Sequence, residues 1–431
     1  MPTTAHSITV SLDELPPLPE LAACWRELET RAQASFFLTW SWIGPWLSTL
    51  GDHAACGGRL LCARQQGKVV GLACVFDAPI RRRLLPLGRA AYINETGVAA
   101  FDALTIEHNG FLLDTANAAA VQQAMFDHVS PAGSRWRELH MRSADRTVFE
   151  ASGVGRDGLR RSGEVHECRT VDLSKIRERG GDFVGLLSAG RRAHVRRCLR
   201  AYGAIGPLQL AQAHDVPTAL GFLERLFVLH NRRWTERAEV SDFDGAFCRT
   251  VHQRIVTEAL PRGEVQILRV SAGAKELGYV YSFVRNGRVC FYQAGYDYRL
   301  LDRRFSPGLV TLVLAIEHNA VKGMEVFDFL AGDQAYKTSL ATDSEFMTSW
   351  TVQRPSLVSS TERALRWNLQ LARSAWARLF STGVRNSVKG VAAAIFTAAL
   401  AAGGGGEFAE VGEDADSPFC LRLGAGRARV A

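Results

Sequence analysis

The sequence of 431 residues gives no sign of a transmembrane segment. A spanning helix needs about 20 mostly apolar residues, and the uncharged stretch at 390–406 is shorter and consists mainly of alanine and glycine. The first residues lack a basic segment followed by an apolar one, so no export signal is predicted. These absences favour a cytoplasmic protein and leave peripheral contact with a membrane open.

The cysteines form neither a disulfide pattern nor a zinc motif. There are nine, an odd number, and none belongs to a Cys-x-x-Cys pair. Most lie in apolar runs, which is typical of buried, reduced thiols in a reducing compartment.

Several catalytic motifs are also missing. The chain has no P-loop, no His-Glu-x-x-His and no Gly-x-Ser-x-Gly. Gly153, Gly155 and Gly158 have the spacing of a dinucleotide-binding motif, but they follow an expected helix where that motif requires a strand. We therefore predict neither serine hydrolysis nor a metal.

The charge balance is mildly basic, because 51 lysines and arginines face 44 aspartates and glutamates. Such an excess suits phosphorylated ligands, nucleic acid or an anionic membrane surface. Arginines recur every four residues on the helix expected at 191–202, which most simply forms a solvated face. Only Tyr202 lies close to them, whereas RNA binding favours interleaved aromatics, so the pattern argues against RNA. DNA binding is not expected.

Hydrophobic periodicity predicts strands mixed with crossover helices in both halves. The expected strands lie at 59–64, 69–76, 102–106, 138–141, 164–173, 208–213, 265–270, 277–285, 288–294 and 326–330. The expected helices lie at 36–46, 117–129, 191–202, 217–234, 243–259 and 307–321. This order indicates an α/β or α+β fold whose mixed, mostly antiparallel sheets are flanked by helices.

The length favours two domains, and the two halves repeat a similar order of elements. We predict a first lobe at 1–175 and a second at 176–354. An amphipathic helical extension would follow at 355–402, and a disordered tail at 403–431.

The second half contains an ordered set of segments. They read Gly-Tyr-Val-Tyr-Ser-Phe from 278, Phe-Tyr-Gln-Ala-Gly from 291, Ser-Pro-Gly from 306 and Phe-Asp-Phe-Leu-Ala-Gly-Asp-Gln-Ala-Tyr-Lys from 327. With the basic helix at 191–200 and the segment 222–234, this set resembles the CelD-like (cellulose-biosynthesis-associated) family of GNAT acetyltransferases, which is related to Fem-type aminoacyl transferases. The resemblance implies two GNAT-like lobes, an acyl-CoA donor and a small amine or hydroxyl acceptor.

Two segments would then hold the donor. Ser306 and Pro307 predict a capped helix start whose free N–H groups attract a diphosphate. Arg303 and Arg304 would add positive charge, and Gly308 is the one glycine of a loop that has two in most GNAT proteins. The resemblance also places the pantetheine arm beside Gln293, Ala294 and Gly295, whose backbone N–H groups could polarise the thioester carbonyl.

The candidate catalytic residues are Asp328, Tyr336 and His230. Asp328 would hold or deprotonate an amine, unless it forms a structural ion pair. Tyr336 could protonate the departing thiolate. His230 is a possible base on an otherwise apolar, buried helix face, and the alternative is a structural role in the core. The acceptor would contact Lys337, Arg233, Asn94 and Glu95. Two polar segments of the first lobe, 94–97 and 102–110 with Glu107, His108 and Asn109, are expected to line a cleft between the lobes.

The leading hypothesis is direct acyl transfer from acyl-CoA to a small molecule or an envelope or polysaccharide precursor. One alternative is aminoacyl transfer from a charged transfer RNA, as the Fem-type relatives imply. The other is a catalytically inactive GNAT-like binding module, which the single-glycine loop favours.

Overall fold

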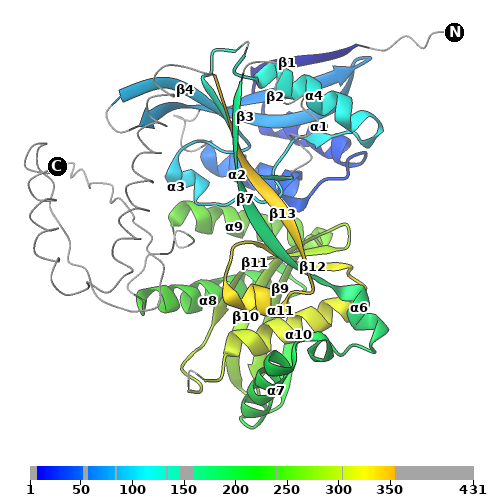
Figure 1. Cartoon of the computed structure of the whole chain (residues 1–431), viewed down its shortest axis with the longest axis vertical. Coiled ribbons are helices and arrows are strands. Elements are labelled where there is room, and N and C mark those ends of the chain that lie inside the picture. Colours follow the sequence, from blue (N-terminus) through cyan, green and yellow to red (C-terminus); the bar gives the residue numbers. More distant parts are fainter. Residues whose placement is uncertain are drawn as a thin grey trace, which may run out of the picture. The chain divides into compact units, whose positions relative to one another are not determined.

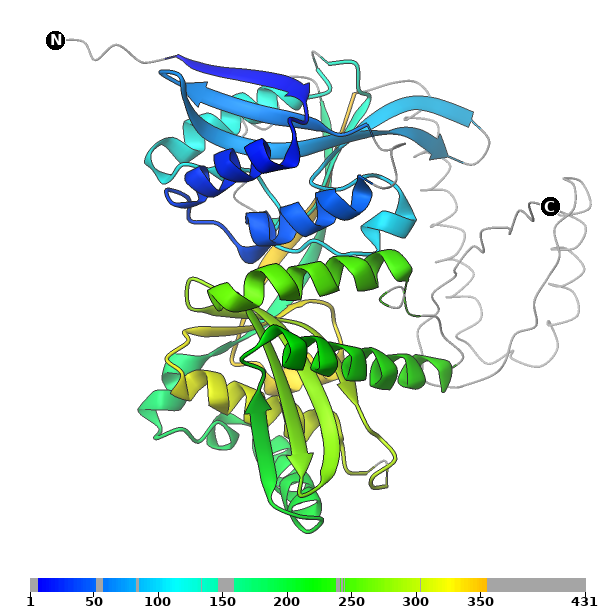
Figure 2. The same cartoon turned by 180° about the vertical axis from the view of Figure 1, so that it is seen from behind.

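The computed structural model describes residues 7–51, 57–82, 85–132, 134–145, 159–237, 241, 243, 245–302 and 304–354. The predicted helical extension at 355–402, the tail at 403–431 and Arg303 lie outside these residues. All described elements belong to one compact unit (Figures 1 and 2).

Thirteen strands of the described chain form a single mixed sheet. They are β1 (Ile8–Glu14), β2 (Arg59–Gln65), β3 (Lys68–Arg82), β4 (Leu85–Ile93), β5 (Leu112–Leu113), β6 (Glu138–Asp145), β7 (Arg160–Asp172), β8 (Leu208–Gln212), β9 (Val265–Ala272), β10 (Lys275–Arg285), β11 (Arg288–Tyr296), β12 (Val326–Ala331) and β13 (Asp343–Gln353).

Helices cover both faces of the sheet. The α-helices are α1 (Leu18–Glu29), α2 (Trp40–Leu50), α3 (Ala99–Asp102), α4 (Ala118–Val129), α6 (Leu173–Glu178), α7 (Ala189–Gly203), α8 (Val216–Thr235), α9 (Ala246–Ala259), α10 (Pro307–Val321) and α11 (Ala335–Leu340). Short 3-10 turns are η1 (Phe36–Leu38), η2 (Thr115–Asn117), η3 (Val184–Leu186) and η5 (Leu260–Arg262). No helix in the described part of the chain combines the length and apolar character needed to cross a membrane.

The strand order reads similarly from either end. It runs β1-β2-β3-β4-β6-β13 from one edge and β8-β9-β10-β11-β12-β7 from the other, so the same pattern of pairings occurs twice. In each half the fourth and fifth strands are parallel, β4 with β6 and β11 with β12, and the other neighbours are antiparallel. The predicted fold class is confirmed, although the two halves share one sheet.

The centre of the sheet contains an exchange of strands. β7 follows β6 in the chain but pairs with β12 of the second half, whereas β13 follows β12 and reaches back to β6 of the first half (Figure 1). The two halves are therefore interlocked through the antiparallel pair of β7 and β13. The division into lobes at residue 175 remains a prediction.

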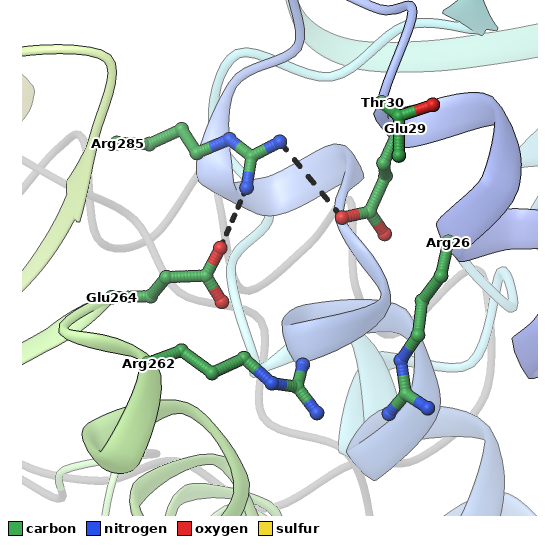
Figure 3. Close-up of a pocket in the computed structure, with 6 residues that line it drawn as sticks. All are labelled: Arg26, Glu29, Thr30, Arg262, Glu264 and Arg285. Carbon is green, nitrogen blue, oxygen red and sulfur yellow. Dashed lines mark hydrogen bonds and ion pairs between the residues drawn. The ribbon is translucent and has the colours of Figure 1, made fainter.

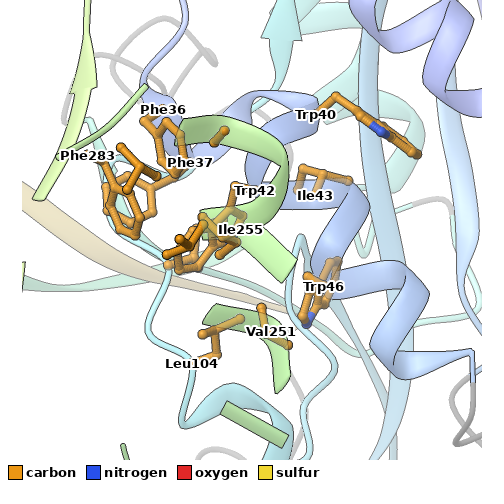
Figure 4. Close-up of a cluster of buried hydrophobic side chains, with 14 of the residues drawn as sticks. Phe36, Phe37, Trp40, Trp42, Ile43, Trp46, Leu104, Val251, Ile255 and Phe283 are labelled. Atoms are coloured by element: carbon orange, nitrogen blue, oxygen red, sulfur yellow. The ribbon is translucent and has the colours of Figure 1, made fainter. Parts of the chain in front are cut away.

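Two cores lie on opposite faces of the second half, because successive side chains of a strand alternate between faces. One packs β10 residues such as Tyr281 and Phe283 against α2, α8 and α9. The other packs Val280 and Phe291 against α7 and α10. The first core crosses into the first half, where Phe36 stacks on Phe283 with ring centroids 4.3 Å apart (Figure 4).

Most predicted elements are present within a few residues of their expected bounds. The predicted strand at 102–106 is wrong, because this segment follows the short helix α3 and is not paired in the sheet. Asp102 is buried there, and its carboxylate accepts hydrogen bonds from the backbone N–H groups of Thr96 and Gly97, which holds the helix against the 94–97 turn. The strands β1, β4, β5 and β13 were not predicted.

Candidate functional site

The parallel strands β11 and β12 pair over only three residues. Their register runs from Arg288 with Val326 to Cys290 with Asp328, and beyond this point the strands separate. β12 is also irregular against its other neighbour, β7, between Asp328 and Ala331. This separation opens the sheet beside the residues that are expected to hold the donor.

A bulge on β11 lies at the start of this opening. Ser282 of β10 pairs with Phe291 and Tyr281 pairs with Gln293, so Tyr292 is the extra residue. Beyond the bulge, the backbone N–H of Ala294 donates to Oε1 of the Gln293 side chain at 3.0 Å. This predicted oxyanion donor is therefore occupied by a side-chain carbonyl that can move away.

The N-terminus of α10 is built as the sequence predicts. Ser306 is the N-cap, and its hydroxyl accepts a hydrogen bond from the N–H of Leu309 at 3.2 Å. Pro307 occupies the first turn, where its missing N–H costs nothing. A Cβ at Gly308 would lie 2.9 Å from the Tyr296 ring, so glycine lets β11 and this turn approach closely.

Arg304 is exposed and forms an ion pair with Asp302 through its Nε at 3.2 Å. It lies two residues before the Ser306 cap, close enough in the chain for its charge to contribute at the helix start. The other predicted arginine of this loop, Arg303, is outside the described residues.

At Gly295 the close backbone approach is made by α8. A Cβ there would lie 2.5 Å from the carbonyl oxygen of Leu226 and 3.0 Å from Cβ of Leu229. Next to it, the buried His230 of α8 contacts the carbonyl oxygen of Ala294 through Nδ1 at 3.2 Å. Its Nε2 contacts Oγ of Ser241 at 2.9 Å, so both ring nitrogens have protein partners.

Asp328 is fully buried and is the centre of an ion-pair network. Its Oδ2 accepts from Nε2 of His108 and from a guanidinium nitrogen of Arg288, each at 2.8 Å, and Oδ1 accepts from the N–H of Leu330 at 2.8 Å. Arg288 also contacts Glu345 at 2.7 Å. Because His108 belongs to the first half, this network joins the two halves at the opening.

The network sets the pKa values of its members. Burial alone would raise the pKa of Asp328, but the hydrogen bond from His108 and the charges of His108 and Arg288 hold it below its usual range. Burial disfavours the charged ring of His108, yet the hydrogen bond to Asp328 and its charge raise the pKa above the usual value. The ionised carboxylate therefore faces the Arg288 guanidinium and a His108 ring whose charged form it favours.

Side-chain atoms of His108, Cys290 and Asp328 lie within 4.8 Å of one another, a grouping that could hold a metal ion. However, the guanidinium of Arg288 contacts the same Oδ2 as His108 and would repel a cation there. We therefore interpret the grouping as an ion-pair network.

Glu107 was outside the predicted site residues, but the structure places it at the opening. Its side chain is buried, and Oε2 accepts from the N–H of Ala331, where β12 has left β11, at 3.2 Å. Burial raises the pKa of this carboxyl to about 7. The sequence placed the polar residues 107–109 in an expected cleft between the lobes, but it did not indicate that Glu107 meets β12.

Lys337 is buried on the short helix α11. Lys337 is therefore not part of an exposed surface turn. Its ammonium donates to the carbonyl oxygens of Ala331 at 2.6 Å and Leu330 at 3.3 Å, and burial lowers its pKa. Leu330 and Gly332 have φ values of 59° and 123°, so the end of β12 turns sharply around the Lys337 ammonium.

Tyr336 and Arg233 lie nearer to the loop that leads into α10. The Tyr336 ring packs edge-on against Phe329 at 6.2 Å, and the residue is 36% exposed. The Arg233 guanidinium stacks over Tyr298 at 4.4 Å and pairs with Glu236 at 3.6 Å.

Asn94 and Glu95 are buried in contacts with the first half. Asn94 donates to Oδ1 of Asn109 at 3.0 Å and to the carbonyl oxygen of Gly110 at 2.8 Å, and its own Oδ1 accepts from the N–H of Cys74. Glu95 pairs with Nε of Arg142 at 2.9 Å. Asn94 thus supports the loop that carries Glu107, and Glu95 is engaged by an arginine.

A separate polar pocket of about 370 Å³ lies between α1 and the segment from η5 to β10 (Figure 3). Arg285 joins its two sides, with a contact of 2.6 Å to Glu264 and one of 3.9 Å to Glu29. None of the predicted site residues lines it, and its ion pairs link the two halves.

Residues 189–338 match the profile of a family described as an acetyltransferase (GNAT) domain. The matched segment begins with α7, ends within α11, and contains the opening between β11 and β12 and the start of α10. This part of the chain is therefore similar to a GNAT acetyltransferase domain. No curated protein matches the sequence.

Several solved structures resemble the chain at low identity. FemX is 10% identical over 79% of this chain and 96% of that one, with a TM-score of 0.49. L-PGS from Bacillus licheniformis is 12% identical over 85% and 98%, with a TM-score of 0.47. A tandem GNAT protein from the clavulanic acid biosynthesis pathway is 13% identical over 81% and 100%, with a TM-score of 0.37. The similarity to GNAT domains rests on the match of residues 189–338 to the family profile.

Proposed function

We propose that the protein is an N-acyltransferase of the CelD-like type. It transfers an acetyl or other acyl group from acyl-CoA to an amine, or to a hydroxyl, of a small molecule or of an envelope or polysaccharide precursor. The reaction takes place in the cytoplasm by direct attack on the thioester. The proposal extends the GNAT similarity of residues 189–338 to a donor and a class of acceptor.

The observation that carries this proposal is the separation of β11 from β12 after Cys290 and Asp328. A gap between parallel neighbours leaves strand N–H groups without their ladder partners. Here the N–H of Ala294 is satisfied by the Gln293 side chain instead. A thioester carbonyl that displaces this side chain would meet an N–H donor already in position.

The start of α10 is the proposed site of the donor's diphosphate. The helix has 15 residues, and the positive end of its dipole attracts anions. Arg303 and Arg304 precede the cap, and arginine binds phosphate oxygens in a fork geometry. Gly308, at the first turn, keeps β11 and α10 close enough for one extended ligand to touch both.

The polar residues around the gap have different proposed roles. Asp328 accepts from three protein groups, so we assign it to positioning the network. Lys337 holds the turn at the end of β12, and His230 holds α8 against β11. Tyr336, exposed beside Phe329, remains a candidate for protonating the departing thiolate.

Calorimetric titration of the full chain with acetyl-CoA tests the donor. The Arg303→Ala/Arg304→Ala double variant is compared with Arg225→Ala, which removes an exposed arginine of α8 paired with Glu276. We expect saturable binding that weakens at least tenfold in the double variant and changes less than twofold in the control. An intact protein that does not bind acetyl-CoA would refute the proposed function.

A further inference from the structure

The first half of the chain contributes a carboxylate to the opening in the second half. Glu107 belongs to the loop between α3 and β5, and its Oε2 reaches the N–H of Ala331 on β12. Its charge also acts on the phenol of Tyr292, the bulged residue of β11. Glu107 therefore lies near both strands at the point where they part.

The loop that carries Glu107 is held rigidly. Asn109 donates to the carbonyl oxygen of Ile93 at 2.9 Å, and its backbone N–H donates to Ser143 at 3.0 Å. His108 adopts φ 45° and contacts Asp328. A non-glycine residue in the left-handed region costs free energy. These contacts offset that cost and fix the direction of the neighbouring Glu107.

Glu107 lies on the face of the sheet opposite α10. Cys290 and Leu330, on either side of the gap, belong to the core formed with α2, α8 and α9, whereas Phe291 and Phe329 belong to the core formed with α10. Asp328, which lies on the same side as Cys290, contacts His108. A donor anchored at α10 would thus reach the gap from one face and meet Glu107 on the other.

The carboxylate retains one oxygen for a ligand. Oε2 accepts a hydrogen bond from the N–H of Ala331. Among the described residues no donor reaches Oε1, and this oxygen is not one of the fully buried polar atoms that lack a partner, so a ligand can reach it. The residue itself is 7% exposed. A buried carboxylate with one free oxygen can accept a proton from a group brought against it.

On the basis of the proposed function, we propose that Glu107 is the catalytic base of this transferase and that the acceptor is a primary amine. Oε1 takes a proton from the acceptor ammonium, and the amine nitrogen then attacks the thioester carbonyl carbon. The C–N bond forms, the nitrogen gives its second proton to solvent, and the C–S bond breaks. The CoA thiolate leaves and takes a proton from the candidate donor Tyr336 or directly from solvent, and Glu107 returns its proton to solvent. Overall, ammonium and acyl-CoA give amide, CoA thiol and one proton.

The surroundings of Glu107 suit this role at neutral pH. Burial raises its pKa to about 7, while the N–H of Ala331 and the charges of His108 and Lys337 lower it and Asp328 raises it. Such a group is ionised for part of the time and basic enough to take a proton. The other titratable groups that face it are kept neutral by burial, which raises the pKa of each: Tyr292, Cys168 and Cys290.

The test follows CoA thiol release from acetyl-CoA by the full chain between pH 5.5 and 8.5. Benzylamine, a protonated primary amine at neutral pH, and hydroxylamine, which is already neutral, serve as probe acceptors. The variants are Glu107→Gln and Glu107→Asp. The control is Glu317→Gln on α10, because burial also raises the pKa of Glu317 to about 7 but the residue is outside the opening.

We expect kcat with benzylamine to fall about 100-fold or more in E107Q, while the Kd for acetyl-CoA changes less than twofold. Transfer to hydroxylamine should fall less than about tenfold, because a neutral amine needs no prior deprotonation. In the intact protein and in E317Q, log kcat with benzylamine should rise with pH and level off near pH 7, and E107Q should lack this rise. E107D should keep the rise at a lower rate.

The possible outcomes distinguish a failure of the Glu107 assignment from a failure of the proposed function. Failure of the intact protein to bind acetyl-CoA refutes the transferase itself. Binding without transfer to either amine overturns the assignment of a primary-amine acceptor. An E107Q that retains more than a third of the benzylamine rate, or loses both acceptors equally, overturns the role of Glu107. If E107Q does not fold, a pH profile of E107D without the rise overturns it as well.

Discussion

The substitution Ser306→Asp separates helix capping at the α10 N-terminus from the proposed binding of the donor's diphosphate there. Aspartate is as good an N-cap as serine, and its carboxylate can accept the Leu309 N–H that the Ser306 hydroxyl accepts at 3.2 Å. The free energy of unfolding should therefore change by no more than about 0.5 kcal/mol. The new negative charge, however, would lie where the donor's diphosphate is proposed to bind.

The expected loss of affinity follows from Coulomb's law. At about 5 Å, two unit charges of like sign repel by roughly 0.8 kcal/mol in water and about 3 kcal/mol at an effective dielectric constant near 20. With two negative charges on a diphosphate, the repulsion is at least about 1.7 kcal/mol, or more than about tenfold in Kd. The effect should shrink as salt is raised.

Calorimetry with acetyl-CoA measures this loss, and urea denaturation measures stability. Ser306→Ala is the matched variant, because it removes the cap without adding charge. It should cost about 1 kcal/mol of stability and weaken binding less than Ser306→Asp. If Ser306→Asp binds acetyl-CoA as tightly as the intact protein at low salt, the diphosphate does not lie at this helix start.

Three further predictions concern the gap and the network around it. Asp328→Asn should lower the free energy of unfolding by about 3–5 kcal/mol, because Arg288 and His108 lose a buried counter-ion. The stability from Asp328, whose pKa is lowered, is lost as pH falls through that pKa, and the stability from His108, whose pKa is raised, is lost as pH rises through its pKa. Urea melts should therefore show the largest cost between these two pKa values, near pH 5–6, and a smaller cost once the pH exceeds the raised pKa of His108. Gly295→Ala should destabilise by about 2 kcal/mol or more, since its Cβ would lie 2.5 Å from a backbone oxygen of α8; an unchanged Tm would contradict that packing. Gln293→Ala should tighten acetyl-CoA binding about fivefold, because it removes the side chain that competes for the Ala294 N–H, a bond worth about 1 kcal/mol; weaker binding would mean that the side chain itself holds the donor.

Local signals in the sequence account for much of the second half. Ser306 and Pro307 determine a helix start through capping and a missing N–H, and both effects act within one turn. The turn between β10 and β11 is equally local, because Asn286 and Gly287 both adopt the positive φ that an Asn-Gly hairpin turn requires. Such features depend on neighbouring residues alone.

These local signals do not predict which strands pair when they are far apart in the sequence. β13 and β7 exchange places between the halves, and their side chains show no period that identifies a partner strand. Glu107 and His108 reach β12 only because the loop at 103–111 is fixed by Asn109. Asp328 illustrates the consequence, since its sequence context left open whether it was paired, and its partners come from residues 40 and 220 positions away.

The most direct test of the account is a crystal structure of the protein with a thioether analogue of acetyl-CoA, which cannot transfer its acyl group. We expect the diphosphate at the first turn of α10 and the acyl carbonyl oxygen within hydrogen-bond distance of the Ala294 N–H, with the Gln293 side chain displaced. An analogue bound elsewhere, or a Gln293 side chain still bonded to Ala294 beside the bound analogue, would contradict the proposed site.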